Sequence, residues 1–344
     1  MEQTDLKTIL EARQAAENVP AGNLAPWFHK GWYERVESWI ADVLDRSKYN
    51  LSGPIQQVKL TDLSIVLRIP VLNGALYFKA VIPAAKYEAA LSQHVSRLHQ
   101  EKSVEIVDIN ENEGWLLMRE VGGVPLRQFP HKHIWQKAIE QYARLQIAET
   151  EHIEALISMG LPDRRLNILK SDIERHLSGM CATGLDKDTT ARIMALKPEL
   201  LKMCEELEGV IPYSIDHGDL HSANIHLVED GIVFFDWGDA TITHPFFSTR
   251  VFWNSLDDLI ASEDEWLGMV QAFRPDYLEP WTKYASIQEL ERLLQISDQL
   301  ACVYRALSWY LYITPNRENV EDSFKKPSQW LALLLEHREL VGIK

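Results

Sequence analysis

Apolar residues follow two different spacings along the chain, and the change of spacing predicts where its helices and strands lie. Residues 27–46 carry tryptophans and aliphatic residues about 3.6 positions apart, as in an amphipathic helix, and residues 5–18 also have a helical pattern. From residue 53 onward, short β-prone runs replace this pattern. We expect strands at 55–60, 64–70 and 75–82, with Asn73-Gly74 as a hairpin turn between the last two.

The β-rich part ends at a glycine-containing break, and the chain beyond it is mainly helical in pattern. A helix at 84–100 and strands at 104–109 and 115–120 precede the break Val121-Gly122-Gly123-Val124-Pro125. The helices expected after it are 131–160, 163–180, 187–208, 248–273, 286–313 and 330–340. This order predicts the α+β class, with a β-rich domain at 1–120 and a larger helical domain at 121–344.

One short β-hairpin interrupts the helical part and gathers polar residues at its open end. Two β-prone runs, 225–228 and 232–235, flank an Asp-Gly turn, which is a strong hairpin signal. Antiparallel pairing should bring Asn224 beside Asp236, because cross-strand neighbours lie roughly 5 Å apart. An amide oxygen and a carboxylate suit a hard cation such as Mg²⁺. Asp219, in the preceding segment His217-Gly218-Asp219-Leu220-His221, adds a carboxylate that could handle a proton.

Two opposite charges lie at apolar positions in the β-rich part. Lys79 lies inside a strand whose two faces are otherwise apolar, and Glu88 shares the apolar face of the helix that follows. A buried ammonium is costly unless it is paired, so a Lys79–Glu88 ion pair is one interpretation. The other is an edge-strand lysine that extends to solvent and a glutamate at the boundary of the helix face.

Composition restricts the classes of function. The formal net charge of −15 argues against a nucleic-acid binder and is consistent with a cationic substrate, although solubility explains it equally well. Cys181, Cys204 and Cys302 have no metal-binding spacing and indicate thiols in a reducing compartment. The chain has no apolar run of membrane-spanning length and its first residues lack a signal-peptide core, so we expect a cytoplasmic protein without a membrane partner.

These features together resemble the protein-kinase-like fold of small-molecule kinases. The nearest family is that of the aminoglycoside phosphotransferases, whose relatives include choline, homoserine and methylthioribose kinases. The resemblance covers residues 53–310, and its most specific part is His217-Gly218-Asp219-x₄-Asn224 followed by Asp236-Trp237-Gly238-Asp239. The order Lys, Glu, Asp-x₄-Asn, Asp is that of the kinase fold.

The resemblance implies transfer of the γ-phosphate of ATP to a hydroxyl of a small molecule such as an aminoglycoside or amino-sugar, with GTP as an open alternative. Lys79 would hold the α- and β-phosphates and Glu88 would orient it. Asp219 would accept the proton of the acceptor hydroxyl, while Asn224 and Asp236 would hold Mg²⁺. The interlobe hinge, which would offer backbone groups to adenine, corresponds to Met118, Arg119, Glu120 and Val121. His217 and His221 would support the catalytic loop.

The chain departs from the pattern in two places. The β-rich part has no Gly-x-Gly-x-x-Gly, so the turn over the phosphates is expected at Leu60-Thr61-Asp62-Leu63-Ser64, with hydroxyl and N–H groups in place of glycines. Ser222 occupies a position where the family often has proline, and we expect it to loosen the loop slightly. The absence of Gly-Lys-Ser/Thr excludes a P-loop kinase.

Two other functions are weighed against a kinase. His217-x-Asp219-x-His221 is locally compatible with a binuclear metallophosphoesterase, but that class needs further Asn-His and His-x-His clusters. The sequence has one His-x-His, His131-x-His133, and it is expected on a surface helix. A kinase fold that binds nucleotide with little catalysis is the other alternative. The unusual phosphate turn favours it, whereas the presence of all five key polar groups argues against it.

The acceptor site is expected in the helical domain after Asp236. Asp239, Asp257 and Trp253 are its candidate residues, since carboxylates beside an aromatic ring can receive a cationic group. For Asp257 and Trp253 the sequence also permits a solvated helix face and a core residue, respectively. The identity of the acceptor and the oligomeric state stay open.

Overall fold

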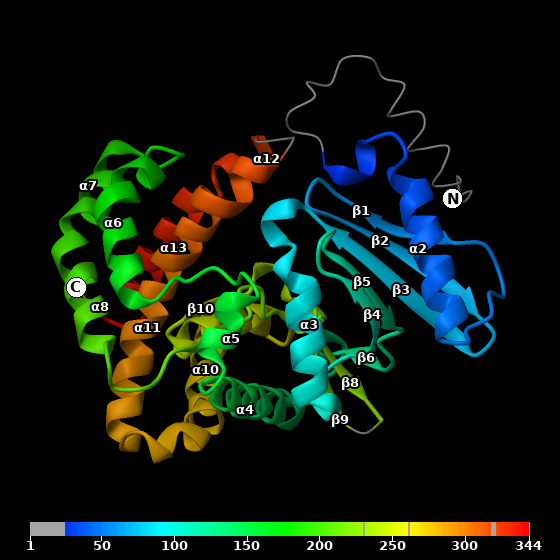
Figure 1. Cartoon of the computed structure of the whole chain (residues 1–344). Helices are drawn as coiled ribbons and strands as arrows, with labels where there is room; N and C mark the ends of the chain where they lie inside the picture. The colour runs from blue at the N-terminus through cyan, green and yellow to red at the C-terminus, as the bar shows by residue number, and fades with distance from the viewer. Residues whose placement is uncertain (1–24, 230, 261, 318–320, 344) are drawn as a thin grey trace. The chain divides into compact units, whose positions relative to one another are not determined.

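The computed structural model describes residues 25–229, 231–260, 262–317 and 321–343, apart from the side chains of residues 263, 264 and 322. The described chain divides into two compact units at Gly122–Gly123 (Figure 1). The first unit runs to Gly122 and includes a short piece that begins at Asn316, and the second comprises Gly123–Pro315 and the C-terminal segment. The helix expected at 5–18 lies outside the described residues.

The first unit is an antiparallel sheet with a helix packed on one face. Its five strands have the order β1-β2-β3-β5-β4, which confirms the five strands predicted before the glycine-containing break. Their bounds are β1 Gln56–Leu60, β2 Ser64–Val71, β3 Gly74–Val81, β4 Ile106–Asn110 and β5 Trp115–Arg119. The helices are α2 Trp32–Arg46 and α3 Tyr87–Leu98.

Alternation along β3 sends neighbouring side chains to opposite faces of the sheet. The buried stripe of α2, which includes Trp32, Val36 and Ile40, forms one core with Phe78 of β3 and Trp115 of β5. The ring centroids of Trp32 and Trp115 lie 6.3 Å apart in an edge-on arrangement. Because side chains alternate along a strand, Lys79 points away from this aromatic core.

The second unit is mainly helical, as predicted. Its helices are α4 Lys132–Glu149, α5 Ile153–Ser158, α6 Leu166–Cys181, α7 Lys187–Ala195, α8 Lys197–Leu207, α9 Thr249–Asn254, α10 Glu263–Leu278, α11 Ile287–Leu307, α12 Glu321–Phe324 and α13 Lys326–Leu340. Several are shorter than expected because the chain has local stop signals. Pro198 follows the break between α7 and α8, and the Ser262 hydroxyl caps α10 by accepting the Glu265 N–H at 3.4 Å.

Two small sheets in the second unit frame the polar segment. The predicted hairpin is present as β8 Ile225–Val228 and β9 Gly231–Phe234. The short strand β6 Val124–Pro125 adds to its edge, and β7 Ser214–Asp216 pairs with β10 Thr241–Thr243. The sequence did not predict β6, β7 or β10, because strands of two or three residues have too few positions to show alternation. None of the described helices is long and apolar enough to cross a membrane.

Candidate active site

The Lys79–Glu88 ion pair is present in the first unit. Lys79 Nζ lies 2.5 Å from Glu88 Oε1, and their side chains are 9% and 3% exposed. The pair forms because β3 and the first turn of α3 each place one charge away from solvent. The pair excludes the alternative of a lysine directed to solvent. It fixes the ammonium of Lys79, the residue predicted to contact nucleotide.

The turn between β1 and β2 is closed by its own threonine. The Thr61 hydroxyl oxygen accepts the N–H groups of Leu63 and Ser64 at 3.2 and 3.0 Å, and Thr61 N–H donates to the Ser64 carbonyl at 2.9 Å. Three of the N–H groups expected to face phosphate, those of Thr61, Leu63 and Ser64, are therefore engaged within the turn. Ser64 is buried, and its contact with phosphate stays a prediction.

The predicted hinge segment is partly engaged in the sheet. Met118 pairs with Tyr77 in the β3–β5 ladder, and the Glu120 N–H donates to the Ala75 carbonyl at 3.1 Å. The Glu120 N–H is thus already bonded, so adenine contacts from this segment would use the Glu120 carbonyl and groups from Val121 onward.

In the second unit, the hairpin brings Asn224 and Asp236 to the same end, as its predicted register requires. Ile225 pairs with Phe234, and the Phe235 N–H donates to the Asn224 carbonyl at 3.3 Å. Asp236 follows directly, in the left-handed conformation with φ 67°. A non-glycine residue there is strained, and such strain is typical of functional sites.

These two residues fit a magnesium ion by the chemistry of their donor atoms. The Asn224 side-chain NH₂ donates to the Asp219 carbonyl at 3.0 Å, which commits the nitrogen and leaves the amide oxygen as an acceptor. With the Asp236 carboxylate, the hairpin end offers the oxygen ligands that Mg²⁺ prefers.

The segment that carries Asp219 makes a sharp turn at Gly218. Gly218 has φ +75°, and a β-carbon on it would lie 2.1 Å from the Asp239 carbonyl oxygen. Only glycine combines this backbone conformation with so close an approach. Gly218 therefore fixes the distance between the Asp219 loop and the segment that follows Asp236.

Gly218→Ala should displace this loop. We expect at least a tenfold loss of turnover and a loss of stability of about 1–3 kcal/mol, because left-handed strain and a backbone clash combine. Gly268→Ala is the matched control, since a β-carbon there would meet nothing within 4 Å. Urea unfolding and steady-state kinetics check both variants, and equal behaviour of the two would refute the role given to Gly218.

His217 joins the loop to the hairpin. Its buried ring places Nε2 2.9 Å from the Phe235 carbonyl, while Nδ1 accepts the Asp219 N–H at 3.4 Å. The tautomer is therefore Nε2–H. Burial lowers the pKa of His217, which keeps the ring neutral and suits it to bridging rather than to acid–base chemistry.

The Asp219 carboxylate has two basic neighbours. His221 Nε2 lies 3.4 Å from Asp219 Oδ2, and Arg305 Nη2 lies 4.0 Å from Asp219 Oδ1. Burial alone would raise the pKa of Asp219, but His221 and Arg305 outweigh it and the pKa is lowered. Asp219 is 39% exposed, so its carboxylate is both ionised and accessible to an acceptor.

His221→Asn should move the acidic limb of the activity–pH profile to higher pH. The asparagine oxygen can still accept the Ala223 N–H that His221 Nδ1 accepts at 3.1 Å, but the contact with Asp219 is lost. Asp219 must be deprotonated to accept a proton, so a raised pKa removes activity from the acidic side only. The exposed residue His133 supplies the control, His133→Asn, and an unshifted limb in His221→Asn would contradict the contact.

Arg305 is a site residue that the sequence analysis missed. Its side chain, on α11, is 6% exposed, and Nη1 lies 3.6 Å from Asp239 Oδ2. It therefore faces Asp219 and Asp239 together. One feature of the sequence could have indicated it. Arg305 is a charged residue among apolar and aromatic positions of α11, such as Ala301 and Tyr304, that are buried in the structure.

A buried polar network anchors β7 immediately before the loop. Gln146 on α4 donates to the Ile215 carbonyl at 2.9 Å, and Ser248 donates to Asp216 Oδ1 at 2.5 Å. The Tyr142 hydroxyl accepts the His217 N–H at 3.0 Å. The residues that hold β7 and the loop are distant from them in sequence. No local pattern could therefore predict these contacts.

The structure decides between the two interpretations of Trp253 and bears on the expected effect of Ser222. Trp253 is fully buried and belongs to the core beside Phe252, with ring centroids 5.4 Å apart, so it does not line an acceptor site. Ser222 does not loosen the loop, because its buried hydroxyl donates to Asp258 in the 3₁₀ segment Ser255–Asp258 and ties the loop to that segment.

Comparison with known proteins decides the family. Residues 57–272 match the model of the phosphotransferase enzyme family, which is more than half of the chain. The chain belongs to this family. The prediction of a phosphotransferase that acts on a small molecule is thereby confirmed. None of the curated proteins is similar enough to be matched.

Solved structures of other phosphotransferases and kinases share the fold. Macrolide 2'-phosphotransferase MphH from Brachybacterium faecium has 14% identity and a TM-score of 0.55, over 86% of this chain and 97% of its own. Choline kinase from Cryptosporidium parvum Iowa II has 13% identity and a TM-score of 0.55, over 98% and 97%. The GDP complex of a variant aminoglycoside 2'-phosphotransferase has 13% identity and a TM-score of 0.60, over 88% and 98%. The predicted α+β kinase-like fold is confirmed.

Within the second unit of this phosphotransferase, the structure brings together the predicted residues Asp219, Asn224, Asp236 and Asp239, and it adds Arg305. Lys79 and Glu88 form their pair in the first unit. Asp257 lies outside this cluster and lines a cavity between α9, α10 and α13.

Proposed function

We propose that this phosphotransferase moves the γ-phosphoryl group of ATP to a hydroxyl of a small molecule, with Asp219 as the group that receives the hydroxyl proton. The observation that carries the proposal is the direct bonding of the Asp219 loop to the hairpin. The Asn224 side-chain NH₂ donates to the Asp219 carbonyl. The His217 ring accepts the Asp219 N–H at Nδ1 and donates from Nε2 to the Phe235 carbonyl. One loop geometry therefore sets the proton acceptor and the two candidate metal ligands together.

The electrostatics of Asp219 suit this role. Phosphoryl transfer depends on positioning and charge neutralisation more than on a strong base, since its transition state is loose. A carboxylate with a lowered pKa is ionised at neutral pH and can orient the attacking hydroxyl before it takes the proton.

The nucleotide roles rest on the chemistry of individual oxygen and nitrogen donors. We assign the α- and β-phosphates to Lys79, whose ammonium is oriented by Glu88 at 2.5 Å. Asn224 and Asp236 would hold Mg²⁺, which supplies charge neutralisation on the phosphates when bound. ATP is the proposed donor and GTP its alternative, since one structural relative was solved with GDP.

We propose that the part of the acceptor that lies next to Asp219 is neutral and carries the hydroxyl group. An aminoglycoside or an amino-sugar could supply such a part. Arg305 lies between Asp219 and Asp239 and offsets part of their negative charge. A cationic group on the acceptor is therefore better accommodated elsewhere in the second unit.

Magnesium-dependent nucleotide binding tests the division of roles. Asp236→Ala should lose most of the Mg²⁺-dependent affinity for ATP, whereas Asp219→Asn should retain it, because only Asp236 is assigned to the metal. Calorimetric titration of ATP with and without Mg²⁺ measures this. Equal loss of affinity in both variants would show that the two carboxylates are not divided in this way.

A further inference from the structure

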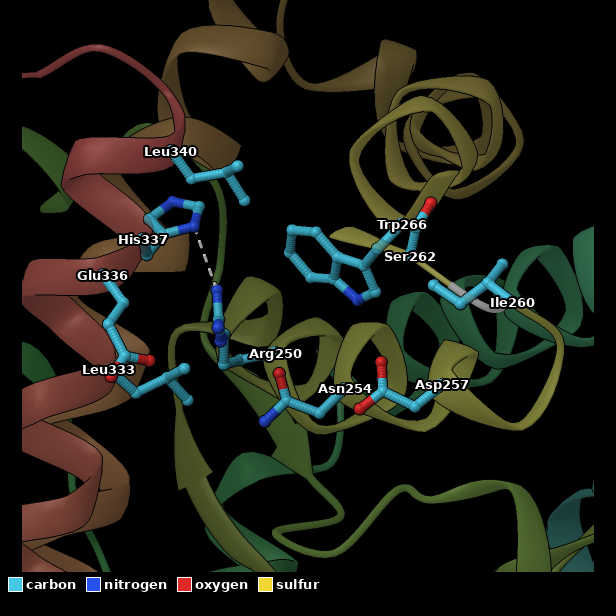
Figure 2. A pocket seen from close by; sticks show the side chains of 10 residues that line it. All are labelled: Arg250, Asn254, Asp257, Ile260, Ser262, Trp266, Leu333, Glu336, His337 and Leu340. Atoms are coloured by element: carbon cyan, nitrogen blue, oxygen red, sulfur yellow. Dashed lines mark hydrogen bonds between the residues drawn. The ribbon is translucent and has the colours of Figure 1, made fainter. Parts of the chain in front are cut away.

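The second unit contains a cavity that the proposed phosphoryl transfer does not use. It has a volume of about 510 Å³, within the range of small-molecule sites. α9 and the segment after it form its floor, and α10 and α13 form its walls (Figure 2). None of the lining residues that the structure describes belongs to the Asp219 loop or the hairpin.

A buried arginine lines this cavity, and none of the described side chains forms an ion pair with it. Arg250 is 2% exposed and makes no ion pair with the side chains that the structure describes. Its Nη1 donates to His337 Nδ1 at 3.1 Å, and its guanidinium lies 5.6 Å from the centroid of the Trp266 ring. Figure 2 shows it between these two aromatic side chains.

The hydrogen-bond partner of Arg250 carries no charge. Burial lowers the pKa of His337 to about 4, so the ring is uncharged at neutral pH and can only accept one hydrogen bond at Nδ1. Arg250 Nε has no hydrogen-bond partner in the described parts of the chain. A guanidinium has five N–H donors and pairs best with a planar, bidentate carboxylate, so a bound carboxylate would satisfy this group.

The rest of the lining indicates what accompanies that carboxylate. Asp257 on the floor and Glu336 on α13 are acidic and disfavour a ligand with several negative charges, but they suit an ammonium group. Leu333, Leu340 and the indole of Trp266 offer apolar surface for a hydrocarbon part. The lining is thus mixed in charge and apolar at its sides.

We propose that this cavity binds a small zwitterion of the amino-acid class, with its carboxylate on Arg250, its ammonium facing Asp257 or Glu336, and its side chain against Trp266. The site adjoins the catalytic segment through the chain itself. Asp257 precedes Asp258, whose carboxylate accepts the Ser222 hydroxyl in the Asp219 loop. The cavity and the loop proposed to act in phosphoryl transfer are therefore connected by Asp257, Asp258 and the hydrogen bond to Ser222.

Binding of three matched probes to the full chain tests this inference, measured by calorimetry without nucleotide. L-phenylalanine carries both charges, L-phenylalaninamide lacks the carboxylate, and phenylacetate lacks the ammonium. Wild type should bind L-phenylalanine at least tenfold more tightly than its amide. Arg250→Gln should reduce the affinity for L-phenylalanine and for phenylacetate at least tenfold, because both probes carry a carboxylate. Arg175 is an exposed arginine of the same unit, and Arg175→Gln should leave both affinities unchanged.

The opposite change comes from the floor of the cavity. Asp257→Asn should bind phenylacetate more tightly and L-phenylalanine less tightly, because it removes one negative charge from the lining. Asp257 is exposed, so its substitution should not prevent folding. If thermal melting shows that Arg250→Gln does not fold, the affinities of Asp257→Asn test the proposal instead. Equal affinity for L-phenylalanine and its amide, unchanged affinity in a folded Arg250→Gln, or no binding by any probe would overturn the proposal. Since no nucleotide is present, these outcomes are separate from success or failure of phosphoryl transfer.

Discussion

Asp219→Asn should reduce kcat by about 10²–10⁴, the range lost when a positioned general base is removed. Asparagine has nearly the same shape, but it can neither accept the hydroxyl proton nor pair as an anion with His221 and Arg305. The KM for nucleotide should change little, because Asp219 is not assigned to the metal. Steady-state kinetics with any acceptor that wild type phosphorylates measures both constants.

Asp239→Asn is the matched control for this variant. It removes the same charge and also lies beside Arg305, at 3.6 Å, but it is not the proposed proton acceptor. Its effect on kcat should be much smaller. If Asp219→Asn retained wild-type kcat, or if the two variants lost the same amount, Asp219 would not be the base.

Glu88→Ala should destabilise the protein by about 3–5 kcal/mol, because it removes the buried carboxylate that pairs with the Lys79 ammonium. The side chains of both residues are largely inaccessible to solvent, so water cannot replace the carboxylate. Nucleotide affinity should fall as well, since Lys79 loses the group that orients it. Urea unfolding followed by tryptophan fluorescence and titration with ATP measure the two effects.

The double variant Lys79→Met/Glu88→Leu separates stability from function. Replacing a buried ion pair with apolar side chains of similar size is often neutral or stabilising, so the free energy of unfolding should recover towards that of wild type. Nucleotide binding should not recover. Wild-type ATP affinity in the double variant would remove Lys79 from the nucleotide site.

Much of the site could be predicted from sequence because its parts are local. The Asp-Gly sequence predicted a hairpin, and the observed register of β8 and β9 brings Asn224 and the segment at Asp236 to one end. The pairing of Lys79 and Glu88 was one of two interpretations of two charges at apolar positions nine residues apart, and the structure shows the pair. In both cases, short-range periodicity carried the information.

The remaining parts depend on contacts distant in sequence. Arg305 reaches Asp219 from α11, and Gln146 supports β7 from α4, so no local spacing relates either residue to the loop. Trp253 was uncertain for the same reason, because a helical aromatic can face the core or a ligand and only packing decides. Ser222 was expected to loosen the loop, but its hydroxyl donates to Asp258, thirty-six residues later in the chain, and this bond ties the loop down.

Phosphorus NMR of the protein with ATP, Mg²⁺ and a panel of aminoglycosides, amino-sugars, choline and homoserine tests the central claim most directly. We predict a new phosphate ester on one of these acceptors, formed in equal amount with ADP and nearly absent with Asp219→Asn. Mg²⁺-dependent ATP binding without any ester across the panel would instead favour a nucleotide-binding module. An ester formed by Asp219→Asn at the wild-type rate would contradict the proposed active site.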